Sequence, residues 1–268
     1  MSERDGYRHG VPCWVDTNQR DPEAAVAFYE RLFGWEAENT MPPGSPGSYF
    51  VCRLRGRDVA AISSQPSEAP AAAWNTYICV DDVDEAAASV AEAGGGILME
   101  PFDVLDAGRL ATFTDPAGGT FRVWQPGTHR GAQLVNEASA WSMSMLNTPD
   151  PEGCEAFYCA VFGWDTEAFD TGQGKITLWR VPGFIGGEPQ QSVSREVVAG
   201  MAPSGNPAAP AHWSVDFWID DVDTASALAP ELGGSVPAPP YDIPGFRQAV
   251  IADPEGAAFT VSQLRLPG

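Results

Sequence analysis

The sequence is poor in basic side chains and has no long apolar run. It carries 15 lysine and arginine residues against 36 aspartate and glutamate residues, which gives a formal net charge of −21. Such a charge repels the phosphates of nucleic acids and the anionic head groups of membranes. No apolar run approaches the roughly 20 residues that a transmembrane helix needs. We therefore expect neither a nucleic-acid partner nor a membrane partner.

Cysteine and histidine are also scarce. The five cysteines are Cys13, Cys52, Cys79, Cys154 and Cys159. An odd number without closely spaced pairs argues against a disulfide framework or a zinc knuckle. The first ten residues are polar and lack the apolar segment of a signal peptide. We expect reduced thiols and a cytoplasmic location.

What the chain does contain is enough apolar material for two domains. Hydrophobic residues make up 44% and aromatic residues 10% of its 268 positions. That composition is typical of globular proteins, and the length suffices for two units. We expect each unit to bury a core of its own.

An internal repeat divides the chain into two related halves. The first motif, Asp21-Pro22-Glu23 followed by Phe28-Tyr29 and Phe33-Gly34-Trp35, returns as Asp150-Pro151-Glu152, Phe157-Tyr158 and Phe162-Gly163-Trp164 at an offset of 129 residues (150 − 21). Two further motifs return in the same order. They are Asp81-Asp82-Val83-Asp84 with Asp220-Asp221-Val222-Asp223, and Asp115-Pro116-Ala117-Gly118 with Asp253-Pro254-Glu255-Gly256. Three motifs in one order indicate a tandem repeat.

The repeat also sets the domain boundaries. The offset grows to 139 residues at the second motif (220 − 81), so the second copy holds about ten extra residues. We place them in the Gly/Pro/Ser-rich stretch 186–210 and expect a surface loop there. The predicted domains cover residues 6–127 and 138–266, with a linker at 128–137.

Each copy contains two predicted helices among strands of period-two alternation. Asp21 is a good N-cap with Pro22 at the first helical position, and Gly34 can end the helix in a left-handed conformation. A second helix is expected from Asp84 to Gly94. Its counterpart contains Pro230, which should kink or shorten it. Each domain is thus expected to consist of two βαβββ units.

The ordered motifs resemble those of the vicinal oxygen chelate superfamily, which includes glyoxalases, bleomycin-resistance proteins and extradiol dioxygenases. The resemblance covers nearly the whole chain, twice. It implies an α+β fold of two tandem domains, in which paired βαβββ units form a cup-shaped mixed sheet with helices on its outer face. It also implies that the two domains face each other as an intramolecular pseudo-dimer, and it leaves homodimerisation open.

The resemblance implies a metal site in each cup, with ligands from three strands. The corresponding positions here are Trp14, Asn75 and Arg122 in the first copy, and Met143, Ser214 and Thr260 in the second. Indole, amide, guanidinium, thioether and hydroxyl groups are poor ligands for a divalent cation. The three histidines, His9, His129 and His212, cannot populate two sites. We therefore predict no cofactor, with a divalent metal as the alternative if His212 replaces its neighbour Ser214.

Alternation also predicts which side chains line each cup. The face opposite the Ile/Val/Phe face carries Trp14, Asp16, Asn75, Tyr77, Arg122 and Trp124 in the first copy. In the second copy it carries Met143, Met145, Ser214, Asp216, Trp218, Thr260 and Ser262, with Trp179, Tyr241 and Phe246 at its border. These residues are predicted to bind a ligand, and the alternative is that they fill the cups as core. The second cup carries fewer aromatic groups near the family's metal positions, so the first cup is favoured as the ligand site.

Three functions follow from this reading. The first is binding of a small aromatic or polar metabolite or drug without a metal ion. The second is a metal-independent enzyme of secondary metabolism, of lyase or isomerase type, in which Asp16 or Asp216 acts as acid and base. The third is a metal-dependent glyoxalase or dioxygenase with relocated ligands. Fold alone does not choose among them.

Overall fold

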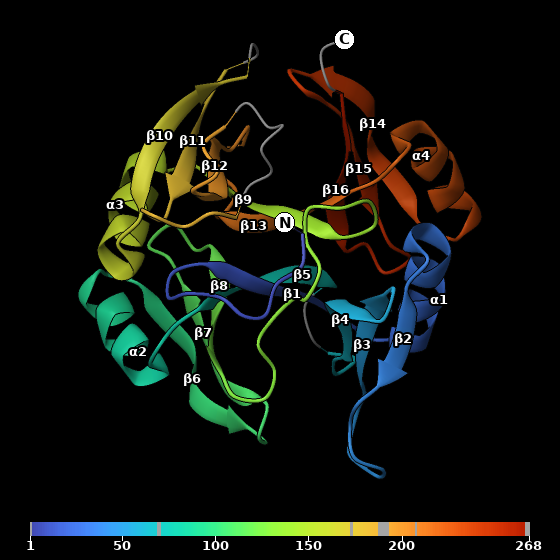
Figure 1. The fold of residues 1–268 in the computed structure, drawn as a ribbon, viewed down its shortest axis with the longest axis horizontal. Helices are drawn as coiled ribbons and strands as arrows, with labels where there is room; N and C mark the ends of the chain where they lie inside the picture. The colour runs from blue at the N-terminus through green and yellow to red at the C-terminus, as the bar shows by residue number, and fades with distance from the viewer. Residues whose placement is uncertain (1, 69–70, 172–173, 187–192, 207, 266–268) are drawn as a thin grey trace.

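The computed structural model describes residues 2–68, 71–171, 174–186, 193–206 and 208–265. It confirms the α+β fold with two copies of one domain (Figure 1). The first copy comprises β1 (Pro12–Gln19), α1 (Pro22–Phe33), β2 (Glu36–Asn39), β3 (Tyr49–Leu54), β4 (Arg57–Ser64), β5 (Ala73–Cys79), α2 (Val83–Glu92), β6 (Gly96–Val104), β7 (Gly108–Thr114) and β8 (Thr120–Pro126). The second comprises β9 (Trp141–Thr148), α3 (Pro151–Phe162), β10 (Asp165–Asp170), β11 (Lys175–Arg180), β12 (Val197–Pro203), β13 (His212–Trp218), α4 (Val222–Glu231), β14 (Ser235–Ile243), β15 (Phe246–Ala252) and β16 (Ala258–Leu264).

Each copy forms one eight-stranded mixed sheet. The strand order is β2-β3-β4-β1-β5-β8-β7-β6 in the first sheet and β10-β11-β12-β9-β13-β16-β15-β14 in the second. In both, the two βαβββ units meet at an antiparallel central pair, β1 with β5 and β9 with β13. The opening strand of each unit pairs in parallel with that unit's last strand, as β1 does with β4 and β5 with β8. The two opening strands and the last strand of the second unit therefore lie side by side in each sheet, as β1, β5 and β8 in the first and as β9, β13 and β16 in the second.

The helix signals in the sequence act as predicted at α1 and α3. The Asp21 side chain accepts a hydrogen bond from the amide of Ala24, and Gly34 ends the helix at φ 73°. Asp150 and Gly163 repeat this arrangement around α3. The expectation that Pro230 shortens the fourth helix is wrong, because α4 spans ten residues, as α2 does. Pro230 lies in the last turn, where few hydrogen bonds remain to be lost.

The predicted loop at 186–210 is only partly correct. Strand β12, Val197–Pro203, lies within that stretch. The added length falls mainly between β11 and β12, where the sequence has residues 181–196 in place of the two-residue turn Arg55-Gly56 that joins β3 and β4. Residues 187–192 of the predicted loop lie outside the described residues. The Gly/Pro/Ser-rich composition predicted the connection correctly, but it did not predict strand β12, which follows the connection.

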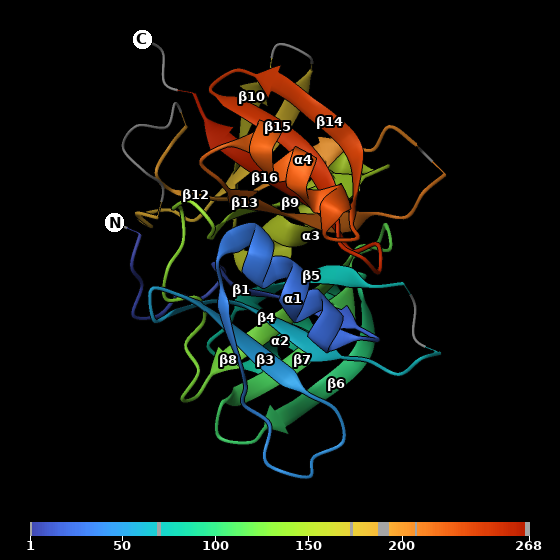
Figure 2. The same cartoon turned by 90° about the vertical axis from the view of Figure 1, so that its right-hand side faces the viewer.

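The two domains share their cores, which corrects the expectation of one core for each. One hydrophobic core joins residues of α1 to residues of β13, α4, β15 and β16. The other joins residues of α2, β7 and β8 to residues of α3, β11 and β12. Accordingly α1 lies beside α4 and α2 beside α3 (Figures 1 and 2). The apolar faces of the helices therefore meet the other domain as well as their own sheet.

Repeat motifs from opposite domains bind each other in these cores. The Tyr29 hydroxyl donates to Asp253 at 2.9 Å, and the Tyr158 hydroxyl donates to Asp115 at 3.0 Å. Burial raises the pKa of both aspartates, although backbone amides of their own turns also bind them. Each tyrosine belongs to the first motif and each aspartate to the third. The motifs thus hold the pseudo-symmetric interface together.

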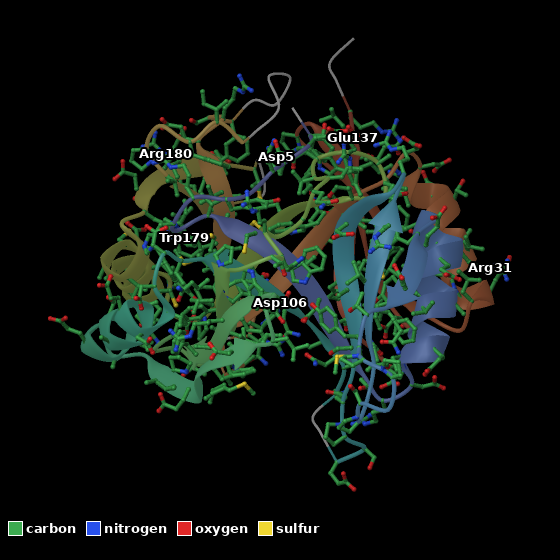
Figure 3. The ribbon with its side chains drawn as sticks, turned by 60° about the horizontal axis from the view of Figure 1, so that its bottom comes forward. Asp5, Arg31, Asp106, Glu137, Trp179 and Arg180 are labelled. Atoms are coloured by element: carbon green, nitrogen blue, oxygen red, sulfur yellow. The ribbon has the colours of Figure 1, made fainter. Side chains whose placement is uncertain are left out.

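Arg31, in the last turn of α1, points outward from the molecule (Figure 3). Among the described residues, no helix combines the length and the apolar character needed to cross a membrane. The N-terminal segment packs on the predicted linker, with Glu3 bridged to Leu134 and the Tyr7 hydroxyl bound to the carbonyl oxygen of Ala132. The linker is therefore held against both domains.

Candidate ligand site in the second cup

A cavity of about 430 Å³ opens in the cup of the second domain. Strands β9, β13 and β16 form its floor, and β10, β11, β14 and β15 form its sides. The lining residues are Ser142, Met143, Met145, Asn147, Phe169, Thr171, Ile176, Leu178, Val193, Ala202, Ser214, Asp216, Trp218, Tyr241, Ile243, Pro244, Phe246, Gln248 and Thr260. A cavity of this size with mostly apolar walls suits a small organic molecule.

Asp216 is the charged group on the floor of this cavity. Its carboxyl accepts hydrogen bonds from the hydroxyls of Ser262 at 2.7 Å and Ser142 at 3.1 Å. Burial raises the pKa of Asp216 from the usual 3.8 to about 7, and the two serine hydroxyls only partly oppose that rise. The carboxyl is therefore poised to change its charge near neutral pH.

A chain of hydrogen bonds connects Asp216 to the rim of the cavity. The hydroxyl of Tyr241 donates to Gln248 at 3.2 Å, and the Gln248 amide donates to Ser262 at 2.9 Å. Ser262 in turn donates to Asp216. An amide does not pass protons on readily, so these residues position the carboxyl rather than conduct protons to it.

The walls around Asp216 are apolar and aromatic. Met143 and Met145 lie on β9, and Trp218 lies on β13 with its ring centroid 6.3 Å from that of Phe246. Phe169 and Ile176 close the opposite side. Thioether and aromatic side chains make favourable contacts with flat ring systems.

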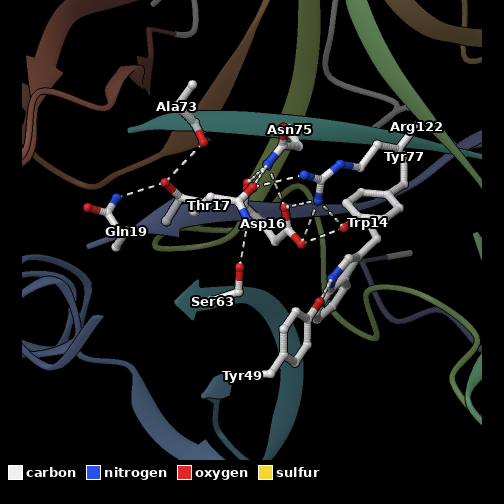
Figure 4. A network of polar contacts seen from close by, with 11 residues as sticks. Trp14, Asp16, Thr17, Gln19, Tyr49, Ser63, Ala73, Asn75, Tyr77 and Arg122 are labelled. Atoms are coloured by element: carbon white, nitrogen blue, oxygen red, sulfur yellow. Dashed lines mark hydrogen bonds and ion pairs between the residues drawn. The ribbon is translucent and has the colours of Figure 1, made fainter. Parts of the chain in front are cut away.

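The first cup is filled by its own polar side chains (Figure 4). Arg122 forms an ion pair with Asp16 at 3.1 Å, as the alternation predicted. The Tyr77 hydroxyl donates a hydrogen bond to the same carboxyl at 2.5 Å, and the Asn75 side-chain amide donates another at 2.8 Å. Arg122 also donates to Asn18 at 2.9 Å. These residues bind one another and leave only the Arg122 Nε, among their buried side-chain polar atoms, without a partner. The arrangement matches the core-filling alternative for the first cup.

Aromatic side chains close the mouth of the first cup. The Trp14 indole donates to the Tyr49 hydroxyl at 2.9 Å. His129 lies edge-on to Trp14, with ring centroids 4.5 Å apart, and 5.8 Å from Trp124. Burial lowers the pKa of His129, which favours the neutral imidazole. His129, a residue of the predicted linker, thus occupies part of the first cup, where we expected a ligand to bind.

The cavity and the cup favoured by the sequence lie in different domains. We expected the ligand site in the first domain, but the large cavity lies in the second. Trp179 is also misplaced, because it is fully buried in the core against Tyr158 and Trp164. Tyr241 and Phe246 line the cavity as predicted. Of the other predicted residues in that cup, Met143, Met145, Ser214, Asp216, Trp218 and Thr260 line the cavity, and Ser262 lies directly beneath Asp216.

Several lining residues were missed by the sequence reading. Asn147 lies on the same face of β9 as Met143 and Met145, two residues further along, so the alternating pattern could have predicted it. Gln248 pairs in register with Ser262, which requires the strand pairing. In the first cup, His129 was also missed, because it lies in an irregular segment to which no periodic pattern points. Phe169 and Ile176 lie on strands whose register the motifs do not fix.

The residues that the resemblance places at the family's metal positions offer chemically poor ligands for a divalent cation. Asn75 and Arg122 donate hydrogen bonds to Asp16, and the Trp14 indole donates to Tyr49. Met143, Ser214 and Thr260 offer a thioether and two hydroxyls, which are weak ligands. Across the described ranges, no group of three or more His, Cys, Asp or Glu side chains is placed to hold a metal ion. His212 is exposed at the start of β13, opposite Asn147.

The comparisons with known proteins agree with the fold. Residues 14–123 match the family model described as "Glyoxalase/Bleomycin resistance protein/Dioxygenase superfamily", and residues 143–262 match that of a "Glyoxalase-like domain". The chain belongs to this superfamily as a two-domain member.

Curated relatives span the full length of the chain. "Putative glyoxylase CFP32" of Mycobacterium bovis is 41% identical over 265 residues, which cover 97% of both chains. "Anthracycline biosynthesis protein DnrV" of Streptomyces peucetius is 35% identical over 275 residues, which cover 97% of this chain and 95% of the relative. The similarity to each of these two relatives therefore extends over both domains of the chain.

Solved structures share the fold at low sequence identity. The Mn(II)-bound glyoxalase of Novosphingobium aromaticivorans superposes with a TM-score of 0.64 at 16% identity, covering 99% of this chain and 84% of that one. The 2,2',3-trihydroxybiphenyl 1,2-dioxygenase of Sphingomonas wittichii gives 0.61 at 15% identity, covering 97% and 93%. These likenesses concern the fold alone.

Proposed function

We propose that the chain binds a small, flat and largely apolar metabolite in the second cup, without a metal ion. The observation that carries this proposal is the cavity of about 430 Å³, whose mostly apolar walls surround the carboxyl of Asp216. The poor fit of Met143, Ser214 and Thr260 to a metal ion supports the metal-independent part. The first cup, filled by Asp16 and Arg122, then serves as a structural partner.

The names of two Streptomyces relatives narrow the class of ligand. They are called anthracycline biosynthesis proteins, and anthracyclines contain fused aromatic rings. A fused-ring compound matches walls made of Met143, Met145, Trp218 and Phe246. We therefore favour a ligand with two or more fused rings.

A calorimetric titration with a hydroxyanthraquinone, in buffer containing EDTA, tests this proposal. We expect binding of about one molecule for each chain, unchanged when EDTA is omitted. Ser214→Phe adds a ring inside the cavity and should abolish binding, whereas Glu231→Phe adds the same ring on the exposed side of α4 and should not. Binding that needs added zinc, iron, nickel or manganese would contradict the proposal, as would binding that survives in Ser214→Phe.

A second candidate is acid–base catalysis by Asp216, and its pKa of about 7 favours it. The ionised carboxylate would remove a proton from a carbon next to a substrate carbonyl and return it to a different carbon, which isomerises the substrate. General acid–base groups contribute roughly 10²–10⁴-fold to such rates. Asp16 is less suited, because Arg122, Tyr77 and Asn75 already occupy its carboxyl.

Proton exchange distinguishes catalysis from simple binding. A catalytic Asp216 would speed the replacement of that ligand proton by deuterium in D₂O, and the rate should rise with pH until the carboxyl is ionised above about 7. Asp216→Asn should abolish the exchange. A bound ligand whose protons exchange at the rate in buffer would leave binding as the function.

A further inference from the structure

We infer that the second cup selects its ligand by charge and takes flat aromatic compounds that carry a protonated amine. This inference rests on the proposed function and adds the chemical class of the ligand. It starts from the side chains that line the cavity. Within the described chain, that lining contains Asp216 but no lysine, arginine or histidine.

Among the residues that the structure describes, none is a cationic partner of Asp216. Its hydrogen bonds come from the neutral hydroxyls of Ser142 and Ser262. Thr260 pairs with it in register on β16, at the position that Arg122 occupies beside Tyr77 in the first sheet. The first cup thus holds its acid with an arginine, and the second cup holds its acid with none. A buried carboxylate without a counter-ion is costly, and an ammonium group on the ligand would relieve that cost.

The other ionisable groups on the strands around the cavity do not take this role. On β11, Lys175 is exposed and Arg180 pairs with Glu167 and Glu196. Arg247 on β15 is bound to Asp223 and Asp242 outside the cavity. His212 lies at the exposed end of β13. Tyr241 on β14 faces Asp216, and burial raises its pKa, so its hydroxyl stays neutral.

The walls and the surface favour a cation as well. Trp218 and Phe246 present aromatic rings, whose faces attract an organic cation. The whole chain carries a formal net charge of −21, which raises the local concentration of cations and repels anions. An anionic ligand would meet Asp216 with no basic side chain on the lining to offset the repulsion.

Three naphthalene compounds of matched shape test the inference. They are 1-naphthylmethylamine, 1-naphthalenemethanol and 1-naphthoate, which are cationic, neutral and anionic, and each is titrated by calorimetry. A hydrogen bond to a charged group contributes about 1.5–3 kcal/mol. At pH 8 we therefore expect the amine to bind about 10- to 100-fold more tightly than the alcohol, and the naphthoate more weakly than both.

Two comparisons tie this preference to Asp216. In Asp216→Asn, the amine should lose its advantage while the alcohol binds as before, and the exposed Glu231→Gln should change neither. In the unmodified protein, the amine should bind more weakly at pH 5.5 than at pH 8, because Asp216 is then protonated. The alcohol should show no such pH dependence. The pH comparison needs no variant and stands even if Asp216→Asn does not fold.

The outcomes separate the inference from the proposed function. Equal binding of all three compounds, or an amine advantage that survives in Asp216→Asn, would overturn the charge selection and leave the cavity as a binding site. No binding of any of the three at millimolar concentration would overturn the inference, and it would overturn the proposed function as well if the hydroxyanthraquinone also failed to bind.

Discussion

Asp16 and Asp216 are two acids on the floors of related cups with opposite surroundings. Asp16 is enclosed by Arg122, Tyr77 and Asn75. Asp216 receives two serine hydroxyls and borders an open cavity. The side chains around Asp16 occupy its carboxyl with an ion pair and hydrogen bonds, whereas the carboxyl of Asp216 faces a cavity that a ligand could enter. Residue chemistry, more than fold, thus distinguishes the two domains.

Replacing Asp216 by asparagine should stabilise the protein at high pH. The folded state raises the pKa of Asp216 from 3.8 to about 7, so between these values it binds more protons than the unfolded state. Stability from this group is therefore lost as pH rises, and the penalty is complete above about pH 7. Such a shift corresponds to at most roughly 4 kcal/mol, because the carboxyl borders an open cavity where solvent screens its charge.

Urea denaturation at pH 8 and pH 4.5 measures this effect. Asp216→Asn should exceed the unmodified protein in unfolding free energy at pH 8 and match it at pH 4.5. A lower unfolding free energy at pH 8 would show that the ionised carboxyl is stabilised in the fold, contrary to the environment described.

Replacing Asp16 by asparagine should destabilise the fold without affecting the second cup. The change leaves Arg122 half-buried without its carboxylate, and breaking such a pair costs about 3 kcal/mol. Asp16→Asn combined with Arg122→Met should recover part of that loss. Thermal unfolding measures the cost, and hydroxyanthraquinone affinity should stay the same. Weakened affinity would place the first cup in the binding machinery.

The sequence could predict those residues of the site that lie on strands with a clear alternation of polar and apolar positions. Period-two alternation assigned Met143, Met145, Ser214, Asp216 and Trp218 to one face, and the structure places all of them on the cavity. It could not tell that the first cup is closed, because His129 enters from an irregular segment. Trp179 was assigned to the wrong face, since the motifs fix no register for β11. Its neighbour Leu178 lines the cavity instead.

At the level of elements, the pairs between motifs should be equivalent in both halves of the pseudo-symmetric core. Tyr29→Phe leaves Asp253 without one donor, and Tyr158→Phe does the same to Asp115. Leaving a buried acceptor short of a partner costs about 1–3 kcal/mol. Chemical denaturation should show similar losses for both variants and almost none for Tyr241→Phe, whose hydroxyl lies at the exposed rim. A loss in only one of the two would show that the halves are not equivalent.

The whole molecule behaves as one unit because its two cores cross the domain boundary. The sequence repeat correctly gave two domains, but repeats alone do not show which apolar faces meet. In the structure, Phe28 and Tyr29 pack in one core with Phe217 and Phe259 of the other domain. Separating the domains would expose both sets to water.

Residues 1–137 alone should therefore not form a stable monomer. The isolated first domain would lose the second-domain half of each core, including Phe157 and Phe217. We expect it to remain unfolded or to self-associate, and co-expression with residues 138–268 should restore a one-to-one complex. Size-exclusion chromatography with circular dichroism decides the matter. A folded monomer with cooperative unfolding would contradict the shared cores.

The most direct test of the second cup as the ligand site is a crystal structure of the chain with 1-naphthylmethylamine at pH 8. The account predicts the ring between Met143, Trp218 and Phe246, with the amine nitrogen about 3 Å from the Asp216 carboxyl. The first cup should keep its Asp16–Arg122 ion pair and hold no ligand. A ligand bound in the first cup, or bound only outside both cups, would contradict the account.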